Sequence, residues 1–203
     1  MSHINLAACL SSTQALGPGN RFALWVQGCC FNCPECIAPA WIPQTTNQLI
    51  SVNALAKRII AIADLEGITL SGGEPMLQAA ELSALIDEIH IKQPKLTVIC
   101  YTGFRLEQLQ KEADCSRLDL LARIDVLIDG TYQQQQNNGL GLRGSDNQQI
   151  HFLTDIYKGQ EAYFTETQRR IELHILEQNE VMMAGIPSKH LPEHLQSVFQ
   201  PGL

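Results

Sequence analysis

Four of the seven cysteines in this 203-residue chain lie within eight consecutive positions, in the segment CCFNCPEC. Cys29, Cys33 and Cys36 have the spacing C-x-x-x-C-x-x-C. Three thiolates on one short loop can hold three irons of a cubane 4Fe-4S cluster, and the fourth iron then stays open to another molecule. An open coordination site indicates chemistry on a bound molecule rather than electron storage.

Two other kinds of metal site use similar loops: a structural zinc site and an electron-carrying cluster with four cysteine ligands. Structural zinc needs four ligands, usually with a second Cys or His pair downstream. Here Cys100 and Cys115 are isolated and the six histidines are scattered. We expect Cys30, next to Cys29, to pack rather than ligate, and Cys9, Cys100 and Cys115 to be small buried hydrophobic side chains.

Charge and hydropathy exclude several classes of protein. The chain has 21 Asp and Glu against 14 Lys and Arg, a formal net charge of −7, which disfavours a nucleic-acid partner. No apolar run approaches the roughly 20 residues that cross a bilayer. The first 16 residues hold no basic segment followed by a hydrophobic stretch, so clustered cysteines indicate a reducing compartment. We therefore expect a cytoplasmic protein with no membrane partner.

Hydrophobic periodicity predicts strands that alternate with helices. Strands are expected at residues 21–26, 67–70, 96–101 and 124–128, and helices at 51–63, 77–91, 106–112 and 118–122. Ser51 would cap the first helix, whose apolar face would include Ala63, and the apolar stripe of the second helix would consist of Leu82, Leu85, Ile86 and Ile89. This alternation implies βα units and a parallel sheet. Residues 131–149 are polar and rich in Gln, Asn and Gly, which predicts a mobile loop. Two strands at 171–176 and 180–184 are expected to form a hairpin, with one short helix after residue 187.

The cysteine loop resembles the signature of the radical S-adenosylmethionine (SAM) superfamily. The stretch GPGNRFALWVQGC at 17–29 is similar to the segment before the cluster loop in glycyl-radical-enzyme activases. The nearest subfamily is the anaerobic ribonucleoside-triphosphate reductase activating proteins, and the similarity covers about residues 17–150. Four further blocks agree in order: LSGGEP at 70–75, YTG at 101–103, VLIDG at 126–130 and LRGSDNQ at 142–148.

The resemblance implies an α/β fold: a partial (β/α) barrel of the radical SAM type, open on one side, with a C-terminal β-hairpin extension. We expect about five or six parallel strands, with the cluster at the C-terminal rim. Residues 1–150 would form the core that holds the 4Fe-4S cluster and SAM. Residues 151–203 would form an extension, a hairpin plus a short helix, packed on that core.

The same resemblance assigns the central site residues. Cys29, Cys33 and Cys36 would ligate the cluster. Gly72 and Gly73 would let the methionyl amino group of SAM approach the backbone, and Glu74 would stabilise that ammonium. The three residues are consecutive in the motif SGGE, which follows a predicted strand, and the two glycines also fit an ordinary tight turn.

Five further residues are assigned to cofactor binding. Glu35 and Ile37 flank the last cysteine and would line the adenine pocket through their main chain, although many superfamily members carry aromatic or polar residues there. Thr102 and Asp129 end predicted strands, where turn chemistry explains them equally well. Arg143 would pair with a carboxylate of SAM or of a partner, or would be a solvated loop charge.

Three functions follow. The leading one is a radical SAM enzyme that cleaves SAM to a 5′-deoxyadenosyl radical and generates a glycyl radical on a large partner, with a flavodoxin- or ferredoxin-like electron donor. A second is a radical SAM enzyme that modifies a peptide or small molecule. A third is a non-enzymatic iron–sulfur carrier or sensor, against which SGGEP argues. Residues 131–149 and the hairpin are the candidate docking surface, and Trp25 and Trp41 either shield the cluster or belong to the core.

Overall fold

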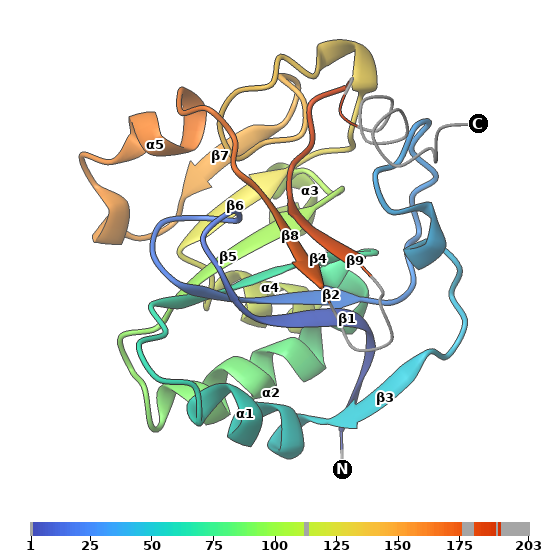
Figure 1. The fold of residues 1–203 in the computed structure, drawn as a ribbon. Helices are drawn as coiled ribbons and strands as arrows, with labels where there is room; N and C mark the ends of the chain where they lie inside the picture. Colours follow the sequence, from blue (N-terminus) through green and yellow to red (C-terminus); the bar gives the residue numbers. More distant parts are fainter. Residues whose placement is uncertain (1, 112–113, 176–180, 190, 192–203) are drawn as a thin grey trace.

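The computed structural model describes residues 2–111, 114–175, 181–189 and 191. Seven of the described strands are, in chain order, β1 (His3–Thr13), β2 (Arg21–Val26), β3 (Gln48–Ser51), β4 (Gly67–Gly72), β5 (Thr97–Thr102), β6 (Val126–Asp129) and β7 (Gln149–Phe152). They form one sheet with the order β3-β1-β2-β4-β5-β6-β7 (Figure 1). β2, β4, β5 and β6 run parallel, and antiparallel pairs join β2 to β1, β1 to β3 and β6 to β7.

The sheet is open and mixed, which agrees with the predicted α/β class, but the expected number of five or six parallel strands is corrected to four. Only the four central strands of the described part are parallel, and β3 and β7 form two separate edges. The connection between β1 and β2 spans residues 14–20, too short for a crossover, so this pair must be antiparallel. Residues 130–148 carry a 3-10 turn but no crossover helix, and β7 consequently returns antiparallel to β6.

Helices cover one face of this sheet (Figure 1). These helices are α1 (Val52–Ile60), α2 (Ala79–His90), α3 (Leu106–Lys111) and α4 (Cys115–Leu121). A fifth, short helix, α5 (Glu161–Thr165), follows β7 and packs on the other face. The Oγ of Ser51 caps α1, as predicted, by accepting from the backbone N–H of Ala54 at 3.3 Å. The helix ends earlier than expected, at Ile60, so Ala63 is exposed rather than part of its apolar face.

Successive side chains of a strand point to opposite faces of the sheet and belong to two hydrophobic clusters, one on each face. Phe22 and Leu24 of β2 pack with α1 and α2, whose predicted apolar stripe is buried as expected: Leu82, Leu85, Ile86 and Ile89. Ala23 and Trp25 face the opposite cluster. That cluster includes Tyr157, Phe164, Ala184 and Ile186, so the segment after β7 covers the second face.

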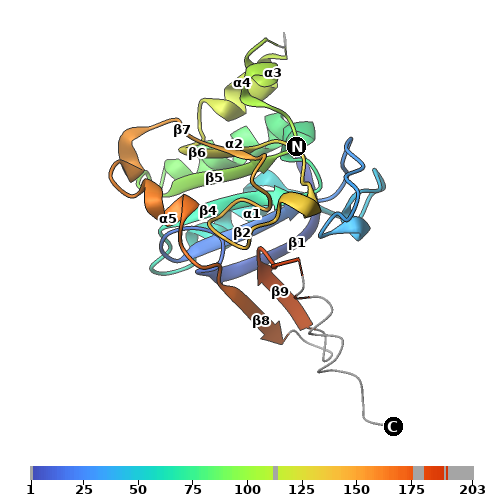
Figure 2. The same cartoon turned by 90° about the horizontal axis from the view of Figure 1, so that it is seen from above.

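The predicted hairpin is confirmed as β8 (Ile171–Ile175) paired antiparallel with β9 (Val181–Gly185). It projects from the side of the sheet where β1 and β2 lie (Figure 2). Its turn, and most of the short helix predicted after residue 187, lie outside the described residues. None of the described helices has the length and apolar character needed to span a membrane.

Candidate functional site

A pocket opens at the C-terminal ends of β4 and β5. The volume open to a water-sized molecule is about 190 Å³. One side, the strand wall, consists of the cysteine loop and the strand ends: Cys29, Cys33, Cys36, Ile37, Gly72, Gly73, Glu74, Thr102 and Gly103. The other side, the loop wall, consists of Gly130, Thr131, Tyr132, Gly144, Gln148, Gly185 and Ile186.

Eight of the eleven residues predicted from the sequence line this pocket: Cys29, Cys33, Cys36, Ile37, Gly72, Gly73, Glu74 and Thr102. The other three, Glu35, Asp129 and Arg143, are described residues that lie outside its lining. Glu35 is exposed and has a left-handed backbone conformation, with φ of 58°. The structure therefore separates the predicted set into a convergent group and three residues with other contacts.

Backbone contacts fix the cysteine loop against β4. Gly28 and Cys29 donate their N–H groups to Trp41 and Ile42, at 2.9 Å each, which closes the base of the loop. Glu74 donates its backbone N–H to the carbonyl of Gly28 at 2.9 Å. A Cβ on Gly73 would lie 2.2 Å from that same carbonyl oxygen, so this close approach requires glycine.

The three predicted cysteine ligands are partly buried free thiols on one wall. Burial raises the pKa of Cys29 to about 11 and also raises the pKa of Cys36. Thiolates bind metal, so binding at this loop must release protons. Within the described residues, no group of three His, Cys, Asp or Glu side chains converges on one ion. Three thiols on one loop are the donors that a cubane cluster needs, because it takes each thiolate on a different iron.

Glu74 is the buried acid of the strand wall, with 1% of its surface exposed. Its Oε1 accepts from the backbone N–H of Met76 at 2.9 Å and from Thr102 Oγ1 at 2.8 Å, and its Oε2 accepts from the Gly103 N–H at 2.7 Å. Burial outweighs these hydrogen bonds and raises the pKa of Glu74 to about 7. A cationic group in the pocket would favour the ionised carboxylate.

Thr102 and Asp129, both at strand ends, have different surroundings. Thr102 lines the pocket and orients Glu74 through its hydroxyl. Asp129 is buried, but its carboxylate accepts from Arg105 Nη1 at 2.9 Å, from the Leu106 N–H at 2.7 Å and from His151 Nε2 at 2.8 Å. It thus anchors the start of α3 to β7, which agrees with a turn role for this residue.

Aromatic side chains also line the pocket, and only Trp25 and Trp41 among them were expected either to shield the cluster or to belong to the core. They are Trp25, Phe31, Trp41, Tyr101 and Tyr132. The rings of Trp25 and Trp41 pack with their centroids 5.8 Å apart. Their flat apolar faces suit an aromatic ring of a ligand. Phe31 lies inside the cysteine loop, and that position is the sequence signal that could have identified it. The residue of this loop assigned to the adenine pocket before the last cysteine was Glu35.

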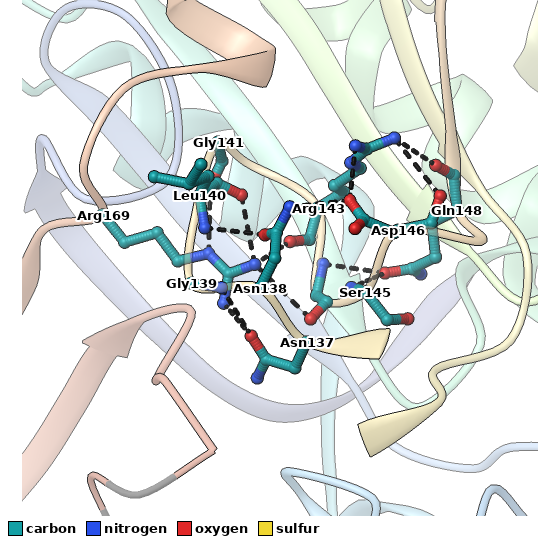
Figure 3. Close-up of polar contacts among 11 residues, drawn as sticks. Asn137, Asn138, Gly139, Leu140, Gly141, Arg143, Ser145, Asp146, Gln148 and Arg169 are labelled. Atoms are coloured by element: carbon teal, nitrogen blue, oxygen red, sulfur yellow. Dashed lines mark hydrogen bonds and ion pairs between the residues drawn. The ribbon is translucent and has the colours of Figure 1, made fainter. Parts of the chain in front are cut away.

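The segment predicted as a mobile loop is held by polar contacts (Figure 3). Arg143, which was expected to pair with SAM or a partner, forms an ion pair with Asp146 and donates to the backbone carbonyl of Gln148 at 3.3 Å. The Gln148 amide bonds three backbone groups at the pocket wall: its Oε1 accepts from Gly144 at 2.7 Å and Ser145 at 3.2 Å, and its Nε2 donates to Gly130 at 2.7 Å. The loop wall is therefore a built structure.

Three of the remaining cysteines depart from expectation. Cys100 is buried, as predicted, whereas Cys9 is only partly buried, and Cys30, which was expected to pack, and Cys115 are exposed. Cys115 is the first residue of α4, after the capping carboxylate of Asp114, and a helix start at the edge of the molecule leaves it in solvent.

Comparison with known proteins places this pocket in context. Residues 15–151 match the family model described as a 4Fe-4S single cluster domain. A Vibrio cholerae protein named anaerobic ribonucleoside-triphosphate reductase-activating protein is 38% identical over 151 residues, covering 68% of this chain and 91% of the relative. Proteins of the same name from phage T4 and Escherichia coli are 30% and 31% identical, covering 68% of this chain and 88% and 91% of those relatives.

Proposed function

The chain belongs to the family of anaerobic ribonucleoside-triphosphate reductase-activating proteins, with a 4Fe-4S single cluster domain, and we propose that it activates such a reductase by radical SAM chemistry. In this proposal it reductively cleaves SAM to a 5′-deoxyadenosyl radical, which generates a glycyl radical on the large partner enzyme. The observation that carries the proposal is the convergence of three cysteines and a buried carboxylate on one pocket.

Each part of the strand wall has a role in this reaction. Cys29, Cys33 and Cys36 would hold the cluster, and an electron delivered to it would cleave the sulfonium C–S bond of the bound SAM. Gly72 and Gly73 would leave the backbone accessible to the methionyl end. Glu74 would accept a charge-assisted hydrogen bond from the SAM ammonium, which would lower its raised pKa.

The rest of the pocket would position the nucleoside and exclude water. Trp25, Phe31, Trp41 and Tyr132 offer apolar faces for the adenine ring, and Ile37 remains a candidate for a main-chain contact with it. For Glu35, Asp129 and Arg143 the assignment to SAM stays a prediction, and their contacts described above favour structural roles. Residues 1–150 would form the core, and residues 151–203 the extension packed on it.

The partners of this proposal are a glycyl radical enzyme and an electron donor of the flavodoxin or ferredoxin type. Residues 131–149 and the hairpin are the proposed docking surface. Leu173, Ile175 and Val181 of the hairpin expose 48%, 82% and 57% of their surfaces, which suits contact with a protein. Deletion of the hairpin would also remove pocket residues, so Ile175→Asp is the cleaner test: it should reduce partner activation and leave SAM cleavage unchanged. Unchanged activation would contradict this surface.

The function itself is tested with anaerobically reconstituted protein. With dithionite as reductant, it should contain four irons per chain and form 5′-deoxyadenosine from SAM. An organic glycyl radical signal should then arise only when the large subunit of an anaerobic ribonucleotide reductase is added. Colourless protein that binds zinc alone, or an iron–sulfur protein that leaves SAM intact, would refute the proposal.

A second candidate keeps the SAM chemistry but changes the substrate to a peptide or small molecule. The observation in its favour is that two residues beyond the matched range, Gly185 and Ile186, line the pocket. Substrate-dependent 5′-deoxyadenosine formation without any glycyl radical on a reductase would select this alternative.

A further inference from the structure

Arg169 lies between α5 and β8, outside the range that matches the family model. Its guanidinium donates to six oxygens, as Figure 3 shows for the loop side. The acceptors are Asn137 Oδ1 at 2.7 Å and the carbonyls of Leu140 at 3.1 Å, Gly141 at 3.1 Å, Arg143, Gly144 at 3.4 Å and Pro187 at 3.3 Å. None of these acceptors is a carboxylate, so the contact is not a salt bridge.

A guanidinium suits this arrangement because it carries five N–H donors in a fixed planar fork. Carbonyl oxygens that point at one place repel each other, and a cation at the centre relieves that repulsion. The loop chain turns tightly to present them: Gly141 has φ of +64°, and a Cβ there would lie 2.3 Å from the carbonyl oxygen of Phe164. Residues 137–144 therefore take their conformation around the Arg169 side chain.

The acceptors of Arg169 adjoin the loop wall of the pocket at two places. Gly144 lines the pocket, and its N–H is held by Gln148, which also lines it. Pro187 directly follows the pocket residue Ile186. Asn137 joins the two places as well, because its Nδ2 donates to the Pro187 carbonyl at 3.1 Å. One side chain thus connects both separate pieces of the wall.

We propose that Arg169 is a positioning residue: by fixing residues 137–144 and the segment just after β9, it holds Gly144 and Ile186 in the loop wall of the pocket. In this way the segment beyond the family match sets the affinity of the pocket for its adenosyl ligand. The inference rests on the proposed function only in naming that ligand as SAM. The role of Arg169 in fixing these residues rests on its six hydrogen bonds.

The test compares Arg169→Gln with Arg170→Gln in the full-length, anaerobically reconstituted protein. Arg170 is the matched control because it is the neighbouring arginine and donates to the exposed Gln14 side chain at 3.1 Å. We measure bound iron, the Kd for radiolabelled SAM by equilibrium dialysis, KM and kcat for SAM cleavage with dithionite, and amide hydrogen exchange of residues 139–144.

Arg169→Gln should raise the Kd and the KM for SAM by about tenfold, with kcat within about threefold and iron content unchanged, because it removes binding rather than chemistry. Exchange at residues 139–144 should accelerate. Arg170→Gln should match the unaltered protein in every measurement. Arg169→Lys keeps the charge but not the fork, so it should give an intermediate Kd and serves as the test if the glutamine variant does not fold.

Unaltered SAM affinity in either Arg169 variant would overturn the inference, as would unaltered exchange in the loop. A fall in kcat with unchanged KM would do so too, since it would place the effect in the chemical step. Failure of the unaltered protein to bind a cluster or SAM would instead refute the proposed function, and the exchange comparison would still decide whether Arg169 orders the loop.

Discussion

The strand wall and the loop wall of the pocket differ in where their charge lies. In the strand wall, the Glu74 carboxylate lines the pocket and accepts hydrogen bonds from N–H and O–H donors. In the loop wall, the charge of Arg169 lies behind the lining and is used on carbonyl oxygens. Among the described lining residues of the loop wall there is no charged side chain and no cysteine. We therefore expect the strand wall to supply the reactive and charged groups and the loop wall to determine the shape of the pocket.

The difference also appears in energetic terms. Burial raises the pKa of Glu74, so the strand wall holds an acid that is costly to ionise until a cation binds. In the loop wall, the Gln148 side-chain amide is bonded to three backbone groups. Substitutions in the strand wall should therefore have the largest effects on cluster and SAM binding. Substitutions in the loop wall should change the free energy of unfolding and the SAM affinity together.

The largest effect is expected from the cysteines of the strand wall. Cys29→Ser, Cys33→Ser and Cys36→Ser should each reduce the bound iron of reconstituted protein more than about tenfold, because the hydroxyl is a poor substitute for a thiolate ligand. Iron and sulfide analysis with the visible absorbance measures this. Cys30→Ser is the control, and it should retain the cluster. An intact cluster in any of the first three variants would contradict the assignment of that cysteine as a ligand and of the strand wall as the cluster site.

Glu74→Gln should weaken SAM binding by about 100-fold, near 3 kcal/mol, because it removes a buried charge-assisted acceptor while preserving side-chain size. Equilibrium dialysis on protein with full iron content measures the effect. Glu81→Gln, at a partly buried position in the first turn of α2, is the matched control. If Arg169→Gln costs more affinity than Glu74→Gln, the loop wall rather than the strand wall dominates recognition.

The stability of the cluster-free protein should depend on pH through Glu74. A carboxyl whose pKa rises from 4.5 unfolded to about 7 folded binds more protons in the folded state between these values, so its contribution falls as pH rises through that window. The loss is on the order of 3 kcal/mol. Urea unfolding from pH 4.5 to 8 should show this slope in the unaltered protein relative to Glu74→Gln. Parallel pH curves for the two proteins would mean that Glu74 is not the group responsible.

Gln148→Leu tests the loop wall directly. The change leaves the N–H groups of Gly144 and Ser145 and the carbonyl of Gly130 without their partner, which should lower the free energy of unfolding by about 2 kcal/mol. SAM affinity should fall severalfold, and iron content should stay constant. Gln133→Leu, on the exposed 3-10 turn of the same segment, should have little effect on either. Loss of the cluster in Gln148→Leu would show that the two walls are not separable.

The strand wall was largely predictable from the sequence because its groups lie in short contiguous blocks. Strands β2, β4, β5 and β6 carry near-continuous apolar runs, and each run ends at a block that supplies pocket residues, such as SGGE after β4. The stripe of α2 was equally plain, since its period fixes one buried face. Strand β1 was missed, because its half-exposed residues show no continuous apolar run.

The loop wall could not be predicted, because a polar side chain that bonds another loop residue has the same sequence signal as a solvated one. Residues 131–149 were expected to be mobile on composition alone. Their oxygens accept hydrogen bonds from Arg169, which lies 25 to 32 positions from its loop acceptors. Arg143 has the same limit, because an ion pair with Asp146, three positions away, has the same sequence signal as a contact with a cofactor or a solvated charge.

Tyr101 gives the smallest expected effect and the finest test of the comparison. Its hydroxyl oxygen is enclosed at the pocket and has no hydrogen-bond partner within the described part of the chain, and burial raises its pKa, so it stays a neutral donor. Removing an unpaired buried hydroxyl costs no hydrogen bond, so Tyr101→Phe should keep the free energy of unfolding or raise it by about 1 kcal/mol. SAM affinity should fall about threefold to tenfold if the hydroxyl donates to the ligand. Lower stability with unchanged affinity would instead indicate a structural partner, and Tyr101 would then belong with the shape-giving residues of the loop wall.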